Sequence, residues 1–229
     1  MDLGSTQFWL AALEIIVINI LLSGDNAVVI ALACRNLPPR QRKWGVIWGA
    51  VGAIVLRIVL TFFAVTLLKL PYLKLVGGVL LLWIGIKLIA DEDEDGGDGV
   101  AEVHGSDKLI AAIRTVIVAD LVMSIDNVLG VAAAAKGSLP LLVFGLVVSI
   151  PLVIAGSQLI MSLVERFPIL ILAGGGLLGY VAGEMMVEDV AVAPWVGTNA
   201  HALEWIVPVA GIAIVVGAAR LLQRRAQHE

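Results

Sequence analysis

The sequence is poor in charge, in cysteine and in histidine. Charged residues make up 15% of the chain and hydrophobic residues 60%, whereas a soluble domain is usually about 25% charged and about 45–50% apolar. The single cysteine excludes an internal disulfide and a cysteine-based metal cluster, and a net charge of −4 argues against a nucleic-acid partner. These shortages exclude an ordinary soluble enzyme and indicate a polytopic protein embedded in a lipid bilayer.

The apolar residues fall into runs long enough to cross a membrane, which takes about 20 residues per helix. We predict an all-α bundle of seven transmembrane helices, near 8–34, 44–68, 72–90, 109–135, 140–164, 168–188 and 203–222. Eleven of the 15 Lys and Arg residues fall on one side of this arrangement. Because basic loops face the cytoplasm, we expect the N-terminus outside and the C-terminus inside.

Two pairs of segments in the chain read alike. Residues 19–35 align with 120–136, and residues 71–92 align with 168–189. Three helices per copy would invert the second copy in the membrane, and inverted repeats build transporters with a binding site at the midplane. We therefore predict a single membrane domain over 1–229, made of a first three-helix repeat at 8–90, an acidic cytoplasmic linker at 91–108, a second three-helix repeat at 109–189 and a seventh helix at 203–222.

Five carboxylic acids lie inside the predicted helices, where a charge is costly and usually functional. They are Glu14, Asp25, Asp120, Asp126 and Glu184. The alignment pairs Asp25-Asn26 with Asp126-Asn127. Asp and Asn supply hard oxygen ligands, which suit Mg²⁺, Ca²⁺ and Mn²⁺. The repeated motif therefore predicts a site for a divalent cation.

Other polar residues accompany these acids. Arg57 lies deep in the second predicted helix, where we expect it to form an internal ion pair. Asn19 aligns with Asp120, so each is a candidate peripheral member of the site. Ser23 and Gly24 favour a break in the first helix, because Gly weakens a helix and Ser competes for backbone hydrogen bonds.

A helix break would also free carbonyl oxygens to act as ligands. The corresponding residues of the second copy, Ser124 and Ile125, are weaker helix breakers. Asp120 and Asp126 are six residues apart and would lie on different faces of an unbroken helix. Only a break in the second copy as well would bring these two carboxylates together.

The two Ser-x-Asp-Asn elements, together with Glu14, resemble the TerC family of integral membrane proteins, and the resemblance covers essentially the whole chain. It implies a bacterial cytoplasmic (inner) membrane protein related to the LysE-like exporters and associated with manganese export. Carried over by motif, it implies a metal site formed by Glu14, Asp25, Asn26, Asp126 and Asn127, with Asp120 as an addition. Auxiliary candidates are Asn19, Ser23, Arg57, Ser124 and Glu184.

The favoured interpretation is an Mn²⁺ exporter that is not an enzyme and has no permanently bound cofactor. Alternating access between the two repeats would move the ion, with proton counter-transport as an option. A LysE-type exporter of cationic amino acids is the alternative within the same class. From other classes, a non-transporting membrane scaffold and an intramembrane aspartyl protease remain open. The protease is disfavoured because the Tyr-Asp and Gly-x-Gly-Asp motifs of those enzymes are absent from the predicted helices.

Overall fold

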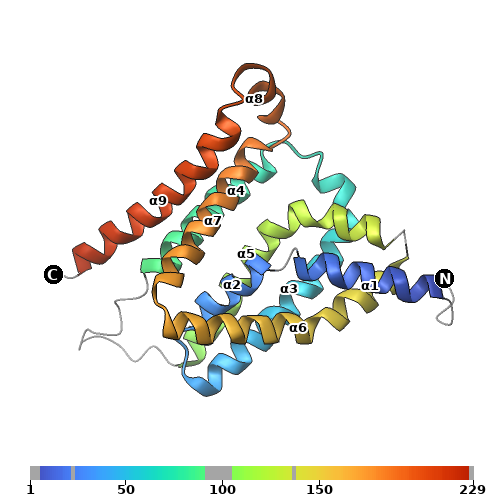
Figure 1. Cartoon of the computed structure of the whole chain (residues 1–229), viewed down its shortest axis with the longest axis horizontal. Coiled ribbons are helices and arrows are strands. Elements are labelled where there is room, and N and C mark those ends of the chain that lie inside the picture. Colours follow the sequence, from blue (N-terminus) through green and yellow to red (C-terminus); the bar gives the residue numbers. More distant parts are fainter. Residues whose placement is uncertain (1–5, 22–23, 91–104, 136–137, 227–229) are drawn as a thin grey trace. The chain divides into compact units, whose positions relative to one another are not determined.

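The computed structural model describes residues 6–21, 24–90, 105–135 and 138–226, and a few side chains within these ranges, that of Asp126 among them, lie outside the description. The described residues are helical, with short turns between the helices (Figure 1). The helices are α1 (Thr6–Leu21), α2 (Gly24–Cys34), α3 (Pro39–Leu67), α4 (Leu73–Ala90), α5 (Gly105–Ala134), α6 (Leu139–Arg166), α7 (Ile169–Val187), α8 (Ala193–Asn199) and α9 (Leu203–Ala226). The predicted acidic linker falls mostly on residues 91–104, outside the described part.

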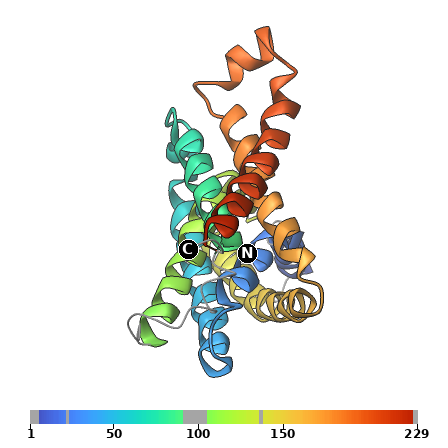
Figure 2. The same ribbon diagram turned by 90° about the vertical axis from the view of Figure 1, so that its left-hand side faces the viewer.

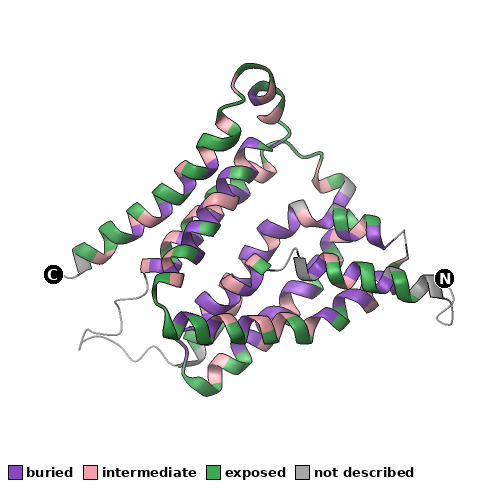
Figure 3. Ribbon diagram, in the orientation of Figure 1, coloured by how far each residue is buried: buried purple, intermediate pink, exposed green. Residues whose placement is uncertain are grey.

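Five of these helices are long and apolar enough to cross a membrane: α3, α4, α6, α7 and α9. A sixth span is formed if α1 and α2, whose axes are bent by 51°, count as one broken crossing. Large apolar side chains stay exposed on the helix surfaces, as along α9, where Trp205 is 71% exposed (Figure 3). Such surfaces fit contact with lipid. The chain is an integral membrane protein whose described part is all-helical. The span predicted near 109–135 falls on α5, which is not among these five or six candidate spans.

The chain divides into two compact units, each with helices from both halves of the sequence. Unit 1 comprises residues 1–68 and 109–161, and unit 2 comprises residues 69–108 and 162–229. Unit 1 thus combines α1, α2 and α3 with most of α5 and α6. Unit 2 combines α4 with α7, α8 and α9, and Figure 2 shows α7 and α9 joined through α8.

Two apolar clusters of unit 1 are built from residues that occupy equivalent positions in the two repeats. One cluster includes Ile30 and Cys34 from the end of α2 together with Val116 from the first half of α5. The other includes Val131 near the end of α5 and Ala135 just after it, together with Ile15 from α1. Each of these residues has its equivalent in the other cluster. The alignment pairs position 30 with 131 and 34 with 135, and the same offset of 101 residues, continued before the aligned segment, pairs 15 with 116. The end of one copy therefore packs on the start of the other in both clusters.

In unit 2, α4 and α7 approach each other closely, and glycines make this possible. A Cβ on Gly78 would lie 2.6 Å from the carbonyl oxygen of Ala182, and one on Gly85 would lie 3.5 Å from that of Gly175. The alignment pairs position 78 with 175 and position 85 with 182, so the two contacts are equivalent. Small residues at these positions therefore let the two helices pack closely.

We expect Gly78→Ala and Gly217→Ala to change stability in opposite directions. The added methyl group at Gly78 would overlap a backbone carbonyl, and overpacking typically costs about 1–3 kcal/mol. Nothing lies within 4 Å of the same methyl group at Gly217. There the better helix propensity of Ala should raise stability by up to about 1 kcal/mol. Thermal denaturation of the two purified variants in detergent measures the difference, and equal effects would show that the α4–α7 contact is not tight.

Asp189, just after α7, caps the start of α4. Its carboxylate accepts hydrogen bonds from the backbone N–H groups of Tyr72 at 2.9 Å, Lys74 at 3.0 Å, Leu75 at 3.3 Å and Ala191 at 2.9 Å. Tyr72 has a left-handed backbone with φ of 66°, a costly conformation for a non-glycine residue. Burial alone would raise the pKa of Asp189, but the four N–H donors outweigh it and hold the pKa below its usual value.

We expect Asp189→Asn to lower the free energy of unfolding at pH 7 by about 1–3 kcal/mol, since hydrogen bonds to a charged group are lost. A lowered folded-state pKa stabilises the protein above the unfolded pKa of about 3.9, and this stabilisation disappears as the pH falls through the folded pKa. The wild type should therefore approach the variant in stability below about pH 4. Thermal midpoints at pH 7 and pH 3 test this.

The matched control is Glu188→Gln at the neighbouring acid. The Glu188 side chain is 53% exposed and lies 3.2 Å from the Lys74 Nζ. Exposed ion pairs contribute about 0–1 kcal/mol. A Glu188→Gln effect as large as that of Asp189→Asn would contradict the capping role.

Candidate functional site

The first Asp-Asn motif lies at a helix break. α1 ends at Leu21 and α2 begins at Gly24, with an angle of 51° between the helix axes. This confirms the break predicted near Gly24. Where α1 ends, its last carbonyl groups lack the N–H donors of a continuing helix. A helix C-terminus carries partial negative charge and attracts cations.

Asp25 and Asn26 lie in the first turn of α2, directly after the break. The Asp25 side chain is partly exposed, and its Oδ1 accepts a hydrogen bond from the Asn26 backbone N–H at 2.8 Å. The N-terminus of α2 favours a negative charge at this position. Asn26 is 5% exposed, and within the described part of the chain neither its Nδ2 nor its Oδ1 has a hydrogen-bond partner. A buried amide without partners is costly, so a polar ligand at this place would be stabilising.

The second motif differs in its backbone. α5 runs without interruption from Gly105 to Ala134, so the helix does not break at Ser124-Ile125, the weaker of the two candidate positions. Ile125 lacks the conformational freedom that Gly24 gives the first copy. Asp120 and Asp126 therefore do not share a helix face. The side chains of Asp126 and Ser23 lie outside the described residues, and Asn127 is half-buried on α5.

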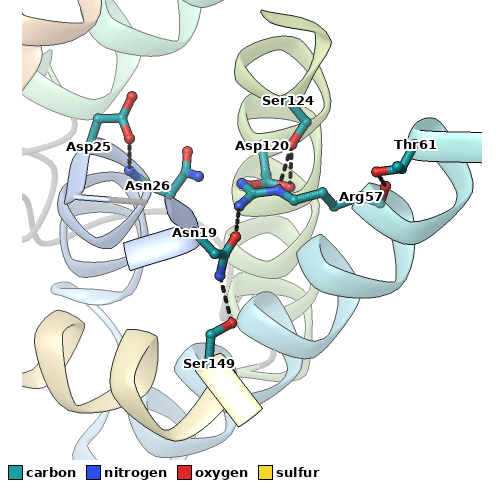
Figure 4. A network of polar contacts seen from close by, with 8 residues as sticks. All are labelled: Asn19, Asp25, Asn26, Arg57, Thr61, Asp120, Ser124 and Ser149. Atoms are coloured by element: carbon teal, nitrogen blue, oxygen red, sulfur yellow. Dashed lines mark hydrogen bonds and ion pairs between the residues drawn. The ribbon is translucent and has the colours of Figure 1, made fainter. Parts of the chain in front are cut away.

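Arg57 occupies the centre of a buried network. Its Nη2 donates to Asp120 Oδ1 at 2.6 Å, its Nε donates to Ser124 Oγ at 3.1 Å, and its Nη1 donates to Asn19 Oδ1 (Figure 4). Arg57 is 2% and Asp120 3% exposed. The internal ion pair predicted for Arg57 is confirmed. Asn19 in turn donates to Ser149 Oγ on α6, so the network joins α1, α3, α5 and α6.

The network engages both carboxylate oxygens of Asp120. Oδ1 accepts from Arg57, and Oδ2 accepts from the Ser124 hydroxyl at 3.1 Å. The metal-ligand role of Asp120, predicted from the family resemblance, stays a prediction. In the structure, Asp120 is placed as the counter-ion of Arg57. Asp25 lies within electrostatic range of both Arg57 and Asp120 (Figure 4).

Two other acids of the predicted site lie outside the group formed by Asp25 and the Arg57 network. Glu14 is exposed on α1, and Glu184 is exposed on α7, in unit 2. Among the described residues, no group of three or more Asp, Glu, His or Cys side chains is placed to hold a metal ion. Asp25 and Asn26 are thus the described members of the predicted site whose geometry suits a ligand.

Sequence reasoning missed two polar contributors. Ser149 accepts from Asn19 across 130 positions of sequence, and Asp189 caps a helix that starts more than 110 residues earlier. A serine within the apolar run 146–150 was the available signal for the first. No local pattern identifies the second, because its partners are backbone groups of a distant segment.

Comparison with known proteins agrees with a membrane protein. The profile described as "Integral membrane protein TerC family" matches residues 4–227. An uncharacterized membrane protein of Bacillus subtilis (strain 168), YjbE, is 41% identical over 92% of this chain and 94% of its own length. The UPF0053 inner membrane protein YgdQ of Escherichia coli (strain K12) is 25% identical over 70% of this chain and 73% of its own length. No solved structure shows significant similarity. The chain belongs to the TerC family of integral membrane proteins.

Proposed function

We propose that this protein exports divalent metal cations, with Mn²⁺ as the principal substrate, across the bacterial cytoplasmic membrane. The observation that carries the proposal is the broken helix, where the Asp25 carboxylate stands beside the buried amide of Asn26. A carboxylate, an amide oxygen and the carbonyl end of α1 are hard oxygen ligands, as Mn²⁺ prefers. In transporters, interrupted helices at membrane depth line the substrate path.

The proposed transport cycle uses two inverted three-helix repeats and a seventh helix. Its support is the reciprocal packing inside each unit: the matched apolar clusters of unit 1 and the equivalent glycine contacts of unit 2. A two-fold relation between the copies produces such reciprocal pairs. In the cycle, the ion binds between Asp25 of the first copy and Asp126 of the second, and a movement of one repeat against the other exposes it outward.

Proton counter-transport is part of this proposal. Two carboxylates that have released a divalent cation repel each other, and taking up a proton relieves that repulsion. The proposed orientation places the N-terminus outside and the basic loop at positions 35–43 in the cytoplasm, since basic loops stay inside.

Cellular metal content tests the proposed function. We expect a deletion strain grown under Mn stress to accumulate more Mn than the parent strain, and expression of the wild-type protein to reverse this. Deletion without Mn accumulation, together with elevated cellular lysine or arginine, would instead favour the amino-acid exporter. No change in either would favour a non-transporting scaffold.

A further inference from the structure

The Arg57 network contains one positive charge, on Arg57, and one negative charge, on Asp120. Arg57 donates to both Asn19 and Asp120, which the alignment pairs with each other. Of these two equivalent positions, the one in the first repeat is neutral (Asn19) and the one in the second repeat is charged (Asp120). A single guanidinium is matched by a single carboxylate, so the buried network has no net charge.

The choice of Asn at one position and Asp at the other has an electrostatic consequence. Two carboxylates would leave the network negative, and two amides would leave a buried guanidinium uncompensated, which is strongly destabilising. Asp25 lies within electrostatic range of the pair (Figure 4), so any net charge on the network would act on a cation held there.

We propose that Arg57 and Asp120 form a permanent neutral pair that sets the charge of the cation site. The pair leaves the two motif carboxylates, Asp25 and Asp126, to carry two negative charges, which one divalent cation neutralises. Asp120 is then a charge-balancing residue and not a ligand, because Arg57 and Ser124 already occupy its oxygens. This inference rests on the proposed function, since it concerns the same cation.

Exchanging Asn19 and Asp120 separates this role from ligation. In the Asn19→Asp/Asp120→Asn variant the carboxylate moves to the other repeat but still meets the guanidinium, so the network stays neutral. The Arg57→Gln/Asp120→Asn variant is also neutral but has neither charge. Asp120→Asn alone leaves the guanidinium uncompensated near the cation.

Isothermal titration of the full-length purified proteins with MnCl₂ in detergent is the test. We expect Asp120→Asn to weaken Mn²⁺ binding by about tenfold or more, because an unbalanced positive charge repels the ion. Both double variants should bind within about threefold of the wild type, which is about 0.65 kcal/mol by the affinity relation. A thermal midpoint for each variant shows that it is folded. If the Arg57→Gln/Asp120→Asn variant does not fold, the Asn19→Asp/Asp120→Asn variant, which retains the ion pair, decides the question.

Two results would overturn the proposal in distinguishable ways. Both double variants binding as weakly as Asp25→Asn, while the wild type binds, would make Asp120 a ligand and leave the proposed function standing. If the wild-type protein does not bind Mn²⁺, and Asp25→Asn gives the same titration, the proposed function itself is refuted, and this inference with it.

Discussion

Replacing Asp25 with Asn is expected to abolish metal binding while leaving the fold intact. Asn keeps the shape of Asp and can still accept the hydrogen bond from the Asn26 N–H, but it removes the charge at the start of α2. Mutating residues that merely support a metal ligand costs about 10–100-fold in affinity, so loss of a ligating carboxylate should cost about 100-fold or more. Titration of the purified variant with MnCl₂ measures this, and its thermal midpoint shows the fold.

Glu165→Gln is the matched control for this prediction. Glu165 is an exposed acid next to the last residue of α6, away from the helix break in sequence. Its neutralisation removes the same charge from the protein as Asp25→Asn does. An Asp25→Asn protein that binds Mn²⁺ as well as the Glu165→Gln protein would show that Asp25 is not a ligand.

Replacing Arg57 with Gln should have the largest effect on stability. The substitution leaves the buried Asp120 carboxylate without its counter-ion, and removing one partner of a buried ion pair typically costs about 3–5 kcal/mol. It also removes the donors that join α3 to α1 and α5. We expect a marked drop in thermal midpoint in detergent and reduced protein in the membrane.

Adding Asp120→Asn to Arg57→Gln should recover part of this loss. The second substitution removes the uncompensated charge, so the double variant should be more stable than Arg57→Gln alone. A double variant no more stable than Arg57→Gln would mean that the two charges do not interact in the folded protein. As an exposed basic control, Arg220→Gln on α9 should change the midpoint little.

Much of the site could be predicted from local sequence. The Ser-Gly pair before Asp25 signals a weak point in an apolar helix, and the structure ends one helix and starts another there. The ion pair of Arg57 follows from the cost of an isolated charge in an apolar span, although the cost alone does not choose its partner among five acids. The partner is Asp120, 63 residues away in sequence, which the packing of α3 against α5 brings next to Arg57.

The unpredicted features depend on contacts distant in sequence. The continuous α5 shows that a Ser followed by Ile does not break a helix that neighbouring helices support. The two compact units also differ from the sequence repeats, because each unit combines helices of both copies. The capping of α4 by Asp189 arises only when α4 and α7 pack together, so neither segment signals it alone.

The central claim is that this chain moves a divalent cation, and flux through the purified protein tests it most directly. In liposomes containing the full-length protein and a Mn²⁺-quenched fluorophore, we predict Mn²⁺ entry that a pH gradient changes in rate and that Asp25→Asn abolishes. Liposomes containing Glu165→Gln protein should behave like those with the wild type. Mn²⁺ flux no faster through wild-type protein than through protein-free liposomes, with the protein shown to be folded, would contradict the account.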